Sequence, residues 1–467
     1  MKRPLQNTLA ATAADGASRL LGFVATAYLA RVLGTSEFGL VSVGFAILGY
    51  AALLASPGLH ILGTREVSAT TDPRRSLAND LNSLRVVLAI GSVVLAALIG
   101  ALVFGLSRHW LMAVLFAASA LPLAWSLDWY FQGKGRIVAT SAAKVLMYGV
   151  YILLVLALVR SPGDALWTPV AFWTANALSA MVLFGLFQKE VGGGVWSWNP
   201  SGWKRLLKES LPLGLSSALT QTIANLPVLI AGALLTMHET GLFSASMKLL
   251  FFVLMIDRVF NIVFFPAISR YRELGEGLFR QLAAVGLKAM FAITFPVTVL
   301  GVAFAPTLLE LVYGPAYVDG TSVLRWLFPY FLFTTTNTVL MSVLYADRRD
   351  KDVLRALAGG TAVLIVLCMG LSLVWHGDGA AVGMSVGEGV ITLMLLSSVG
   401  VSGLLRPLRI IIPFLLGGAA MAVVLGMMHD MQLLLCVLAA LVSFGLCVLA
   451  LGGIGRQDVQ FLKQRFV

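Results

Sequence analysis

Residues 30–42, ARVLGTSEFGLVS, recur in outline at residues 232–244, GALLTMHETGLFS. At an offset of 202 residues, five of these thirteen positions are identical: Leu33/Leu235, Glu37/Glu239, Gly39/Gly241, Leu40/Leu242 and Ser42/Ser244. Each copy joins two long apolar stretches. Similarity at a fixed offset indicates a repeated structural unit, so we predict that the chain contains two related halves.

Apolar stretches of this kind continue to the C-terminal end. Of the 467 residues, 59% are hydrophobic and 12% are charged, whereas a soluble domain carries roughly a quarter charged residues. A membrane-spanning helix needs about 20 apolar residues. We therefore predict an all-α integral membrane protein with fourteen spans, near residues 12–33, 38–62, 81–104, 110–131, 139–159, 168–188, 210–235, 240–264, 282–304, 321–345, 354–375, 380–402, 409–428 and 431–452.

The basic residues alternate between the connections of this scheme. Of the 33 Lys and Arg residues, 24 fall in connections or at span ends (Arg85, Arg355 and Arg409) on the side that holds the N-terminus. Two (Arg108 and Arg160) fall in connections on the other side, and the remaining seven lie within spans. Cytoplasmic loops carry an excess of Lys and Arg. The pattern predicts that both termini are cytoplasmic in a bacterial inner membrane.

The repeat fixes the expected domain organisation. Six spans separate the two copies, and an even number gives both halves the same orientation in the membrane. We predict an N-lobe at 1–188, a cytoplasmic linker at 189–209, a C-lobe at 210–402, and two extra spans with a cytoplasmic tail at 403–467. Tryptophans and the basic run 204–208 (KRLLK) in the linker predict a helix lying in the membrane interface.

Composition also excludes several classes of site. The three cysteines, Cys368, Cys436 and Cys447, lie in apolar runs without metal-ligand spacing, and the five His residues are scattered. No metal and no cofactor are therefore expected. The net charge of +11 is spread over the connections instead of one face, so nucleic acid is not an expected partner.

Several motifs resemble a known family. They are SRLLGF at 18–23, ARVLG at 30–34, EFGL at 37–40, PGL at 57–59 leading to REV at 65–67, FPAISR at 265–270, and VYGPAY at 312–317 leading to VLR at 323–325. In order and spacing they resemble the polysaccharide (O-antigen type) flippases of the multidrug/oligosaccharidyl-lipid/polysaccharide (MOP) exporter superfamily. The resemblance covers nearly the whole chain.

This resemblance implies a fold and a substrate. The fold is two six-helix lobes around a central cavity, lined largely by the first two helices of each lobe. The substrate class is undecaprenyl-pyrophosphate-linked oligosaccharide, moved from the cytoplasmic to the periplasmic leaflet for polysaccharide biosynthesis. Membrane lipids and polysaccharide polymerase or export proteins are the partners that this function implies.

Three other functions remain open. Lipid II flippases share the SR-LGF start but typically follow it with an Arg-Asp pair, where this chain has Ala25-Thr26. A drug or cation antiporter would suit a cationic lining poorly. A membrane glycosyltransferase or polymerase usually has a sizeable periplasmic loop, whereas the longest one expected here, 305–320, carries only Glu310 and Asp319 as charged residues.

Four basic residues are the candidate substrate-binding groups. Arg19 and Lys248 lie roughly 11–12 Å from the nearer ends of their predicted spans, where a charge costs about 2.5–3.5 kcal/mol and usually faces a cavity or a partner. Arg31 and Arg258 lie nearer the ends, so snorkelling to the interface is the alternative for them. The alternative for Arg19 is neutralisation by Asp15, four residues earlier.

Two acidic residues are the candidate proton carriers. Glu388 lies mid-span between Gly387 and Gly389, and Asp15 lies in the first span. Burial favours the neutral form of a carboxyl group and so suits proton uptake and release. For Glu388, a helix–helix hydrogen bond is the alternative role.

Prolines interrupt several predicted spans. Pro57, Pro212, Pro227 and Pro296 are such positions, and a break at membrane depth is tolerated where neighbours or a cavity satisfy the freed carbonyl groups. Pro57 and Pro227 are candidate bending points for alternating access, and ordinary kinks are the alternative.

Overall fold

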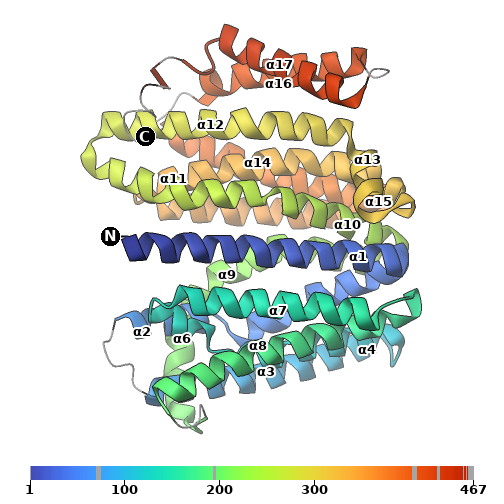
Figure 1. The fold of residues 1–467 in the computed structure, drawn as a ribbon, viewed down its shortest axis with the longest axis vertical. Helices are drawn as coiled ribbons and strands as arrows, with labels where there is room; N and C mark the ends of the chain where they lie inside the picture. Colours follow the sequence, from blue (N-terminus) through green and yellow to red (C-terminus); the bar gives the residue numbers. More distant parts are fainter. Residues whose placement is uncertain are drawn as a thin grey trace. The chain divides into compact units, whose positions relative to one another are not determined.

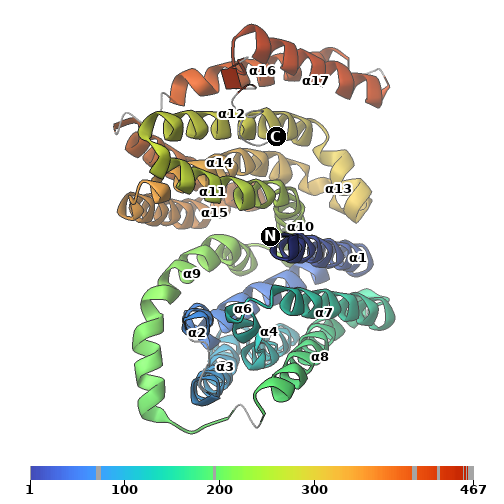
Figure 2. The same ribbon diagram turned by 60° about the vertical axis from the view of Figure 1, so that its left-hand side comes forward.

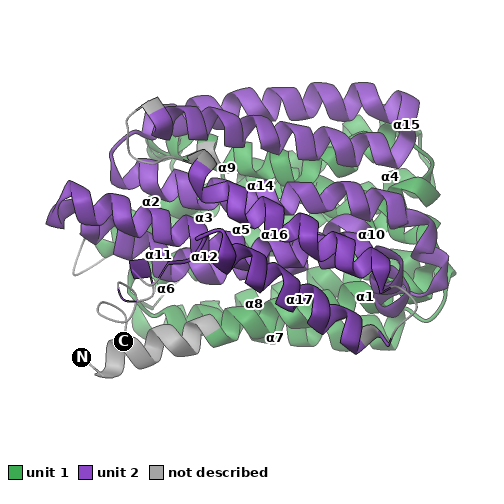
Figure 3. Cartoon of the chain, turned by 90° about the horizontal axis from the view of Figure 1, so that it is seen from above, with its two compact units in different colours: residues 1–245 green, residues 246–467 purple. Residues whose placement is uncertain are grey.

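The chain is helical throughout the part that the structure describes. The computed structural model describes residues 2–69, 75–192, 196–401, 407–428, 432–455, 457, 458 and 460, and no β-strand occurs within them. Packing divides the chain into two units, residues Met1–Ala245 (unit 1) and Ser246–Val467 (unit 2), which are coloured separately in Figure 3.

Unit 1 contains the first nine helices and the start of the tenth. They are α1 (Lys2–Ala55), α2 (Leu59–Ser68), α3 (Arg75–Phe104), α4 (Arg108–Ala118), α5 (Ala120–Trp125), α6 (Asp128–Gly133), α7 (Ile137–Leu158), α8 (Trp167–Glu190), α9 (Pro200–Leu234) and α10 (Met237–Val253), with a short 3-10 helix at Pro162–Leu166 (Figure 1).

Unit 2 begins within α10. Its other helices are α11 (Met255–Leu274), α12 (Glu276–Ala303), α13 (Ala305–Tyr313), α14 (Thr321–Ala346), α15 (Asp350–Val401), α16 (Pro407–Met427) and α17 (Leu433–Ala450), with a short 3-10 helix at Pro315–Gly320.

Two of these helices are pairs of spans joined through a tight break. In α1 the break is Gly34, with φ 71° and ψ 175°, a conformation that glycine adopts without the steric penalty of a Cβ. In α15 it is Trp375–His376, where His376 has φ 50° and ψ −129°. These breaks lie at or beside the gaps between predicted spans, at 34–37 and 376–379, so α1 and α15 each correspond to two predicted spans.

The predicted membrane architecture is confirmed. Among the described residues, eleven helices are long and apolar enough to cross a membrane. Two of them, Ala13–Ala55 and Asp350–Gly400, contain the breaks just described, and Leu434–Ala450 is a shorter apolar helix. Counting each broken helix twice and adding the shorter one gives about fourteen segments. The chain is a multi-span membrane protein.

Some predicted boundaries are wrong. The span predicted at 38–62 ends at Ala55, because Pro57 and Gly58 interrupt the helix and Gly58 adopts φ 74° before α2 begins. The span predicted at 240–264 divides at Leu254 into α10 and α11. The span predicted at 210–235 belongs to α9, which begins ten residues earlier, at Pro200.

The start of α9 is amphipathic. Trp203 and Leu206 are buried with Leu59, Leu62 and other apolar residues of the unit 1 core. Lys204, Arg205 and Lys208 are exposed on the opposite face, as expected for a helix that meets the membrane interface. The three residues 193–195 of the predicted linker lie outside the described residues.

Figure 2 shows α9 strongly bent, so that its first part crosses the direction of its second part. Pro212 and Pro227 lie inside this helix. Because proline lacks a backbone N–H and its ring clashes with the preceding turn, prolines account for bending within a helix. The first part of α9 contributes Trp203 and Leu206 to the unit 1 core, and the second part packs along α1.

Each unit has an aromatic-rich core and an apolar exterior. The core of unit 1 contains Trp129, Phe131 and Phe187, and that of unit 2 contains Phe291 and Phe414 among others. The outer surfaces expose large apolar side chains, such as those of α3 and α17. Exposed apolar surface of this extent marks contact with hydrocarbon.

Candidate functional site

Arg19 lies on the first half of α1 and forms an ion pair within that helix. Its Nε atom lies 2.8 Å from Oδ2 of Asp15, one helical turn earlier. Both side chains are partly exposed, at 38% for Arg19 and 29% for Asp15. Asp15, the alternative partner predicted from the sequence, is thus in contact with Arg19. The guanidinium group has further N–H donors that are available to bind an anion.

Arg31 lies one turn before the Gly34 break of the same helix, and its side chain is exposed. Twelve residues of helix separate it from Arg19, which corresponds to roughly 18 Å. These two cations therefore occupy different depths along α1. At this separation the two side chains are too far apart to bind one phosphate group together. If both bind the substrate, they would contact it one after the other.

Lys248 and Arg258 lie in unit 2, on either side of the break at Leu254. Lys248 is on α10 and is half-buried, whereas Arg258 is on α11 and is exposed. Their separation along the chain is similar to that of Arg19 and Arg31. Because Arg19 and Lys248 belong to different units, their joint action on one substrate stays a prediction.

Two other basic residues within spans have structural partners. Lys288 Nζ lies 2.8 Å from Oδ2 of Asp458, and Arg325 Nε donates to the carbonyl oxygen of Val302 at 3.2 Å. These contacts satisfy the charge or its donors locally. Neither residue was proposed to bind substrate, and the structure supplies a packing role for both.

The repeat counterparts of the two central cations differ in role from them. Gln221, at the position matching Arg19, donates from Nε2 to the carbonyl oxygen of Gly49 at 3.0 Å. Ala46, at the position matching Lys248, is buried in unit 1. Helix packing occupies both counterparts, so the fold itself does not require a charge at either position.

Glu388 is buried, with 6% of its surface exposed. Asn337 on α14 donates from Nδ2 to Oε1 of Glu388 at 3.1 Å and to its backbone oxygen at 3.2 Å. The second carboxyl oxygen, Oε2, has no partner among the described residues. The helix–helix hydrogen bond is therefore present, and one oxygen remains to hold a proton.

A second carboxyl group contacts the next residue of α14. Thr338 donates from Oγ1 to Oδ2 of Asp257 at 2.9 Å, while Oδ1 of Asp257 lacks a partner within the described ranges. Asn337 and Thr338 are neighbours in sequence, so α14 contacts both acids. Sequence reasoning missed these two residues, although the polar run 334–338 (TTTNT) within an apolar span was a signal for them.

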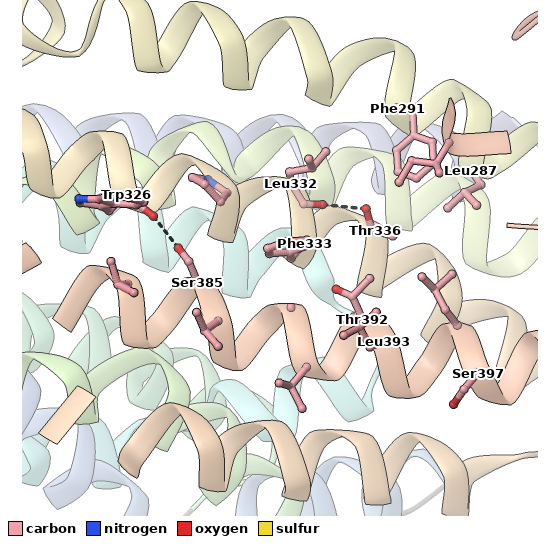
Figure 4. A pocket seen from close by; sticks show the side chains of 17 residues that line it. Leu287, Phe291, Trp326, Leu332, Phe333, Thr336, Ser385, Thr392, Leu393 and Ser397 are labelled. Atoms are coloured by element: carbon pink, nitrogen blue, oxygen red, sulfur yellow. Dashed lines mark hydrogen bonds between the residues drawn. The ribbon is translucent and has the colours of Figure 1, made fainter. Parts of the chain in front are cut away.

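A cavity within unit 2 is apolar. It has a volume of about 760 Å³ and lies between α14 and α15, with α12 and α16 at its edges. Its polar groups are used within the protein: Ser385 donates to the Trp326 carbonyl oxygen at 2.6 Å and Thr336 to that of Leu332 at 2.7 Å (Figure 4). No charged side chain lines it, so this cavity suits hydrocarbon and not a pyrophosphate.

A family comparison identifies the chain. The family model described as "Polysaccharide biosynthesis protein" matches residues 5–272, more than half of the 467 residues. The chain belongs to this family. The match includes Arg19, Arg31, Lys248, Arg258 and Asp15, but Glu388 lies beyond it.

Individual relatives agree with this assignment. A protein of Escherichia coli (strain K12), provisionally named as an O-antigen transporter, is 19% identical over 395 residues, covering 84% of this chain and 95% of the relative. Its name describes a transporter and not an enzyme.

Solved structures define the fold of this polysaccharide biosynthesis family member. The lipid II flippase MurJ in an inward closed conformation has a TM-score of 0.75 at 14% identity, covering 96% of this chain and 99% of that one. An inward-facing MATE family multidrug resistance transporter of the MOP superfamily has a TM-score of 0.65 at 16% identity, covering 83% and 95%. The chain therefore has the MOP transporter fold.

Proposed function

We propose that the protein is a flippase for undecaprenyl-pyrophosphate-linked oligosaccharide repeat units. It moves them from the cytoplasmic to the periplasmic leaflet of the inner membrane by alternating access through a cationic cavity. The observation that carries this proposal is the family match, which spans the helices bearing Arg19 and Lys248. Membrane-buried cations are expensive unless a function retains them.

The substrate has two parts with different needs. Its prenyl tail can remain in hydrocarbon, but the pyrophosphate and the sugars require a wet path with fixed positive charge. Arg19 offers a planar fork suited to phosphate, and Lys248 offers a compact charge. Arg31 and Arg258, placed further along their helices, would receive or release the same head group.

Orientation follows from the distribution of Lys and Arg. Both termini are assigned to the cytoplasm, with the Gly34 and His376 breaks on the periplasmic side. The lobes are assigned as 1–188 and 210–402, joined by the amphipathic start of α9. This arrangement gives the two halves the same orientation, a parallel repeat of a kind found in transporters that work by alternating access.

Energy coupling is assigned to the carboxyl groups. Glu388 is buried and keeps one oxygen without a partner among the described residues, so it can exchange a proton with little rearrangement. Asp15 is a second candidate, since its ion pair with Arg19 would link protonation to substrate contact. The membrane potential already favours outward movement of negative charge, by about 2.3 kcal/mol per charge per 100 mV.

Lipid II flipping is the second candidate function. The fold match to MurJ favours it, because both substrates share a prenyl pyrophosphate. Lipid II flippases typically have an Arg-Asp pair at the positions that Ala25 and Thr26 occupy in this chain. This difference argues against lipid II as the substrate. Polysaccharide polymerase and export proteins are the partners that would use the product of the first function.

A deletion strain tests the proposal. Without the protein, lipid-linked repeat units should accumulate in the cytoplasmic leaflet, as measured by sidedness of labelling in spheroplasts and everted vesicles, while lipid II turnover stays normal. Accumulation of lipid II with normal repeat-unit export would instead support the second candidate.

A further inference from the structure

Within unit 1, the second half of α1 packs along α9. Gln221 of α9 donates to the carbonyl oxygen of Gly49 at 3.0 Å, and the amide group of Asn225 packs against Gly49. These two helices belong to different predicted lobes, yet both lie within the same packing unit. Their contact is called the seam below.

One end of the seam is a contact between backbones. A Cβ atom placed on Gly39 would overlap the carbonyl oxygen of Met237 and lie 2.9 Å from the backbone nitrogen of Gly241. A Cβ atom on Gly241 would lie 2.7 Å from the carbonyl carbon of Thr35. Only glycine at both positions permits this approach, and the two glycines occupy identical positions of the 202-residue repeat.

A side-chain hydrogen bond accompanies this contact. Oγ1 of Thr35 lies 2.7 Å from Nδ1 of His238. Thr35 follows the Gly34 break of α1, and His238 follows the end of α9 at Leu234. In each predicted lobe this is the junction between the first and second spans, so the hydrogen bond joins the two junctions. The repeated motif therefore contacts its own copy.

The other end of the seam is closed in a similar way. A Cβ atom on Gly58 would lie 2.5 Å from the backbone nitrogen of Gly214, and one on Gly214 would lie 2.9 Å from the carbonyl carbon of Pro57. Each partner is next to an interruption: Gly58 follows Pro57 at the end of α1, and Gly214 follows Pro212 within α9. Such positions can absorb a change in backbone direction.

The two contacts are separated by most of the membrane. Residues 39–55 of α1 extend for roughly 24 Å at about 1.5 Å per residue, and Gly58 lies beyond them. A hydrocarbon core is about 30 Å thick. The charge pattern assigns the Gly39 end to the periplasm and the Gly58 end to the cytoplasm.

We propose that Gly39–Gly241 and Gly58–Gly214 are the periplasmic and cytoplasmic closures of the transport path, which open in alternation. This inference rests on the proposed flippase function and its orientation. Backbones that meet at glycine can approach closely, and the glycines themselves have no side chain to repack when the backbones separate. Thr35 and His238 add a directional bond that holds the periplasmic closure when it is shut.

Cross-linking tests the periplasmic closure. In a chain whose three cysteines are replaced, Thr35→Cys with His238→Cys should react with a short cross-linker that forms a disulfide with each thiol. Transport should be lost, and a reductant that cleaves these disulfides should restore it. The matched control is Ala143→Cys with Ser179→Cys, a pair on α7 and α8 within one predicted lobe, where Ser179 Oγ donates to the backbone oxygen of Ala143 at 2.9 Å. Cross-linking the control pair should leave transport unchanged.

Glycine substitutions give a readout that needs no substrate. Gly241→Ala should hold the periplasmic end apart and increase labelling of Thr35→Cys by a membrane-impermeant thiol reagent. Gly58→Ala should not increase that labelling. The control is Gly149→Ala on α7, where a new Cβ would meet nothing within 4 Å.

The outcomes separate this inference from the proposed function. If the labelling changes as expected but no lipid-linked oligosaccharide moves, the closures stand and the substrate assignment fails. If the cross-linked Thr35→Cys/His238→Cys protein moves its substrate at the rate of the control pair, or if Gly241→Ala leaves labelling unchanged, the closure assignment is overturned.

Discussion

The guanidinium Nε of Arg19 lies 2.8 Å from Oδ2 of Asp15, and both side chains remain partly exposed. Arg19 lies near the middle of its predicted span, where a charge usually faces a cavity or a partner. Asp15 supplies such a partner on the same helix face. The contact uses Nε of Arg19, and the guanidinium group has further donors with which it can bind an anion.

The first prediction concerns this pair. Arg19→Ala should severely reduce export with normal amounts of protein in the membrane, because the fixed charge for the pyrophosphate is lost. Arg19→Lys should be partly active, since the charge survives without the bidentate geometry. Export is measured as periplasmic lipid-linked repeat units.

The double variant supplies the control for Arg19. If Arg19 serves only to neutralise Asp15, then Asp15→Ala combined with Arg19→Ala should recover export. We expect no recovery. Restored export in the double variant would make the pair structural and remove Arg19 from the substrate path.

The second prediction concerns Glu388. Glu388→Gln is nearly isosteric and can still accept from Asn337 through its amide oxygen, so the protein should fold and bind substrate. Transport in vesicles should lose its dependence on the pH gradient. A gradient response equal to that of the parent protein would exclude Glu388 from coupling.

The third prediction concerns the hydrogen bond from Asn337 to Glu388. Asn337→Ala leaves the buried carboxyl group of Glu388 without its donor, and an unsatisfied buried group costs about 1–3 kcal/mol. In detergent, the Asn337→Ala protein should therefore unfold at a lower temperature than the parent protein. At acidic pH the Asn337→Asp protein should be destabilised less, because its protonated side chain can donate to Glu388. Equal unfolding temperatures for all three proteins would show that this bond is not made.

The fourth prediction is topological. In a cysteine-free background, Lys204→Cys and Lys351→Cys should be protected from an impermeant thiol reagent in intact cells, and His376→Cys should react. All three positions are exposed. External labelling at Lys351→Cys would contradict the assigned orientation, because the alternation of Lys and Arg would then be accidental.

The spans were predictable because each depends on a local property. About 20 apolar residues are needed to cross hydrocarbon, and turn residues such as Gly34 mark where a helix must break. The division of α10 from α11 at Leu254 has no such mark, since neither Pro nor Gly lies at the break. The continuity of α9 from Pro200 through the end of the predicted linker was also missed, because the prolines inside this helix, Pro212 and Pro227, do not end it.

The candidate site was only partly predictable for a related reason. The Arg19–Asp15 pair follows from four-residue spacing on one helix. The contact of Asn337 with Glu388 joins residues 51 positions apart, and no periodicity specifies which helices pack together. The contact of Gly39 with Gly241 is of the same kind: the repeat marked both glycines, but their meeting depends on the folding of unit 1.

Transport of defined substrates in reconstituted vesicles tests the central claim most directly. Vesicles containing the protein receive a fluorescent undecaprenyl-pyrophosphate oligosaccharide or lipid II in one leaflet, and movement to the other leaflet is measured by quenching. We predict movement of the oligosaccharide, loss of that movement in Arg19→Ala and in Lys248→Ala, and little movement of lipid II. Equal movement of the oligosaccharide in parent, Arg19→Ala and protein-free vesicles would contradict the account.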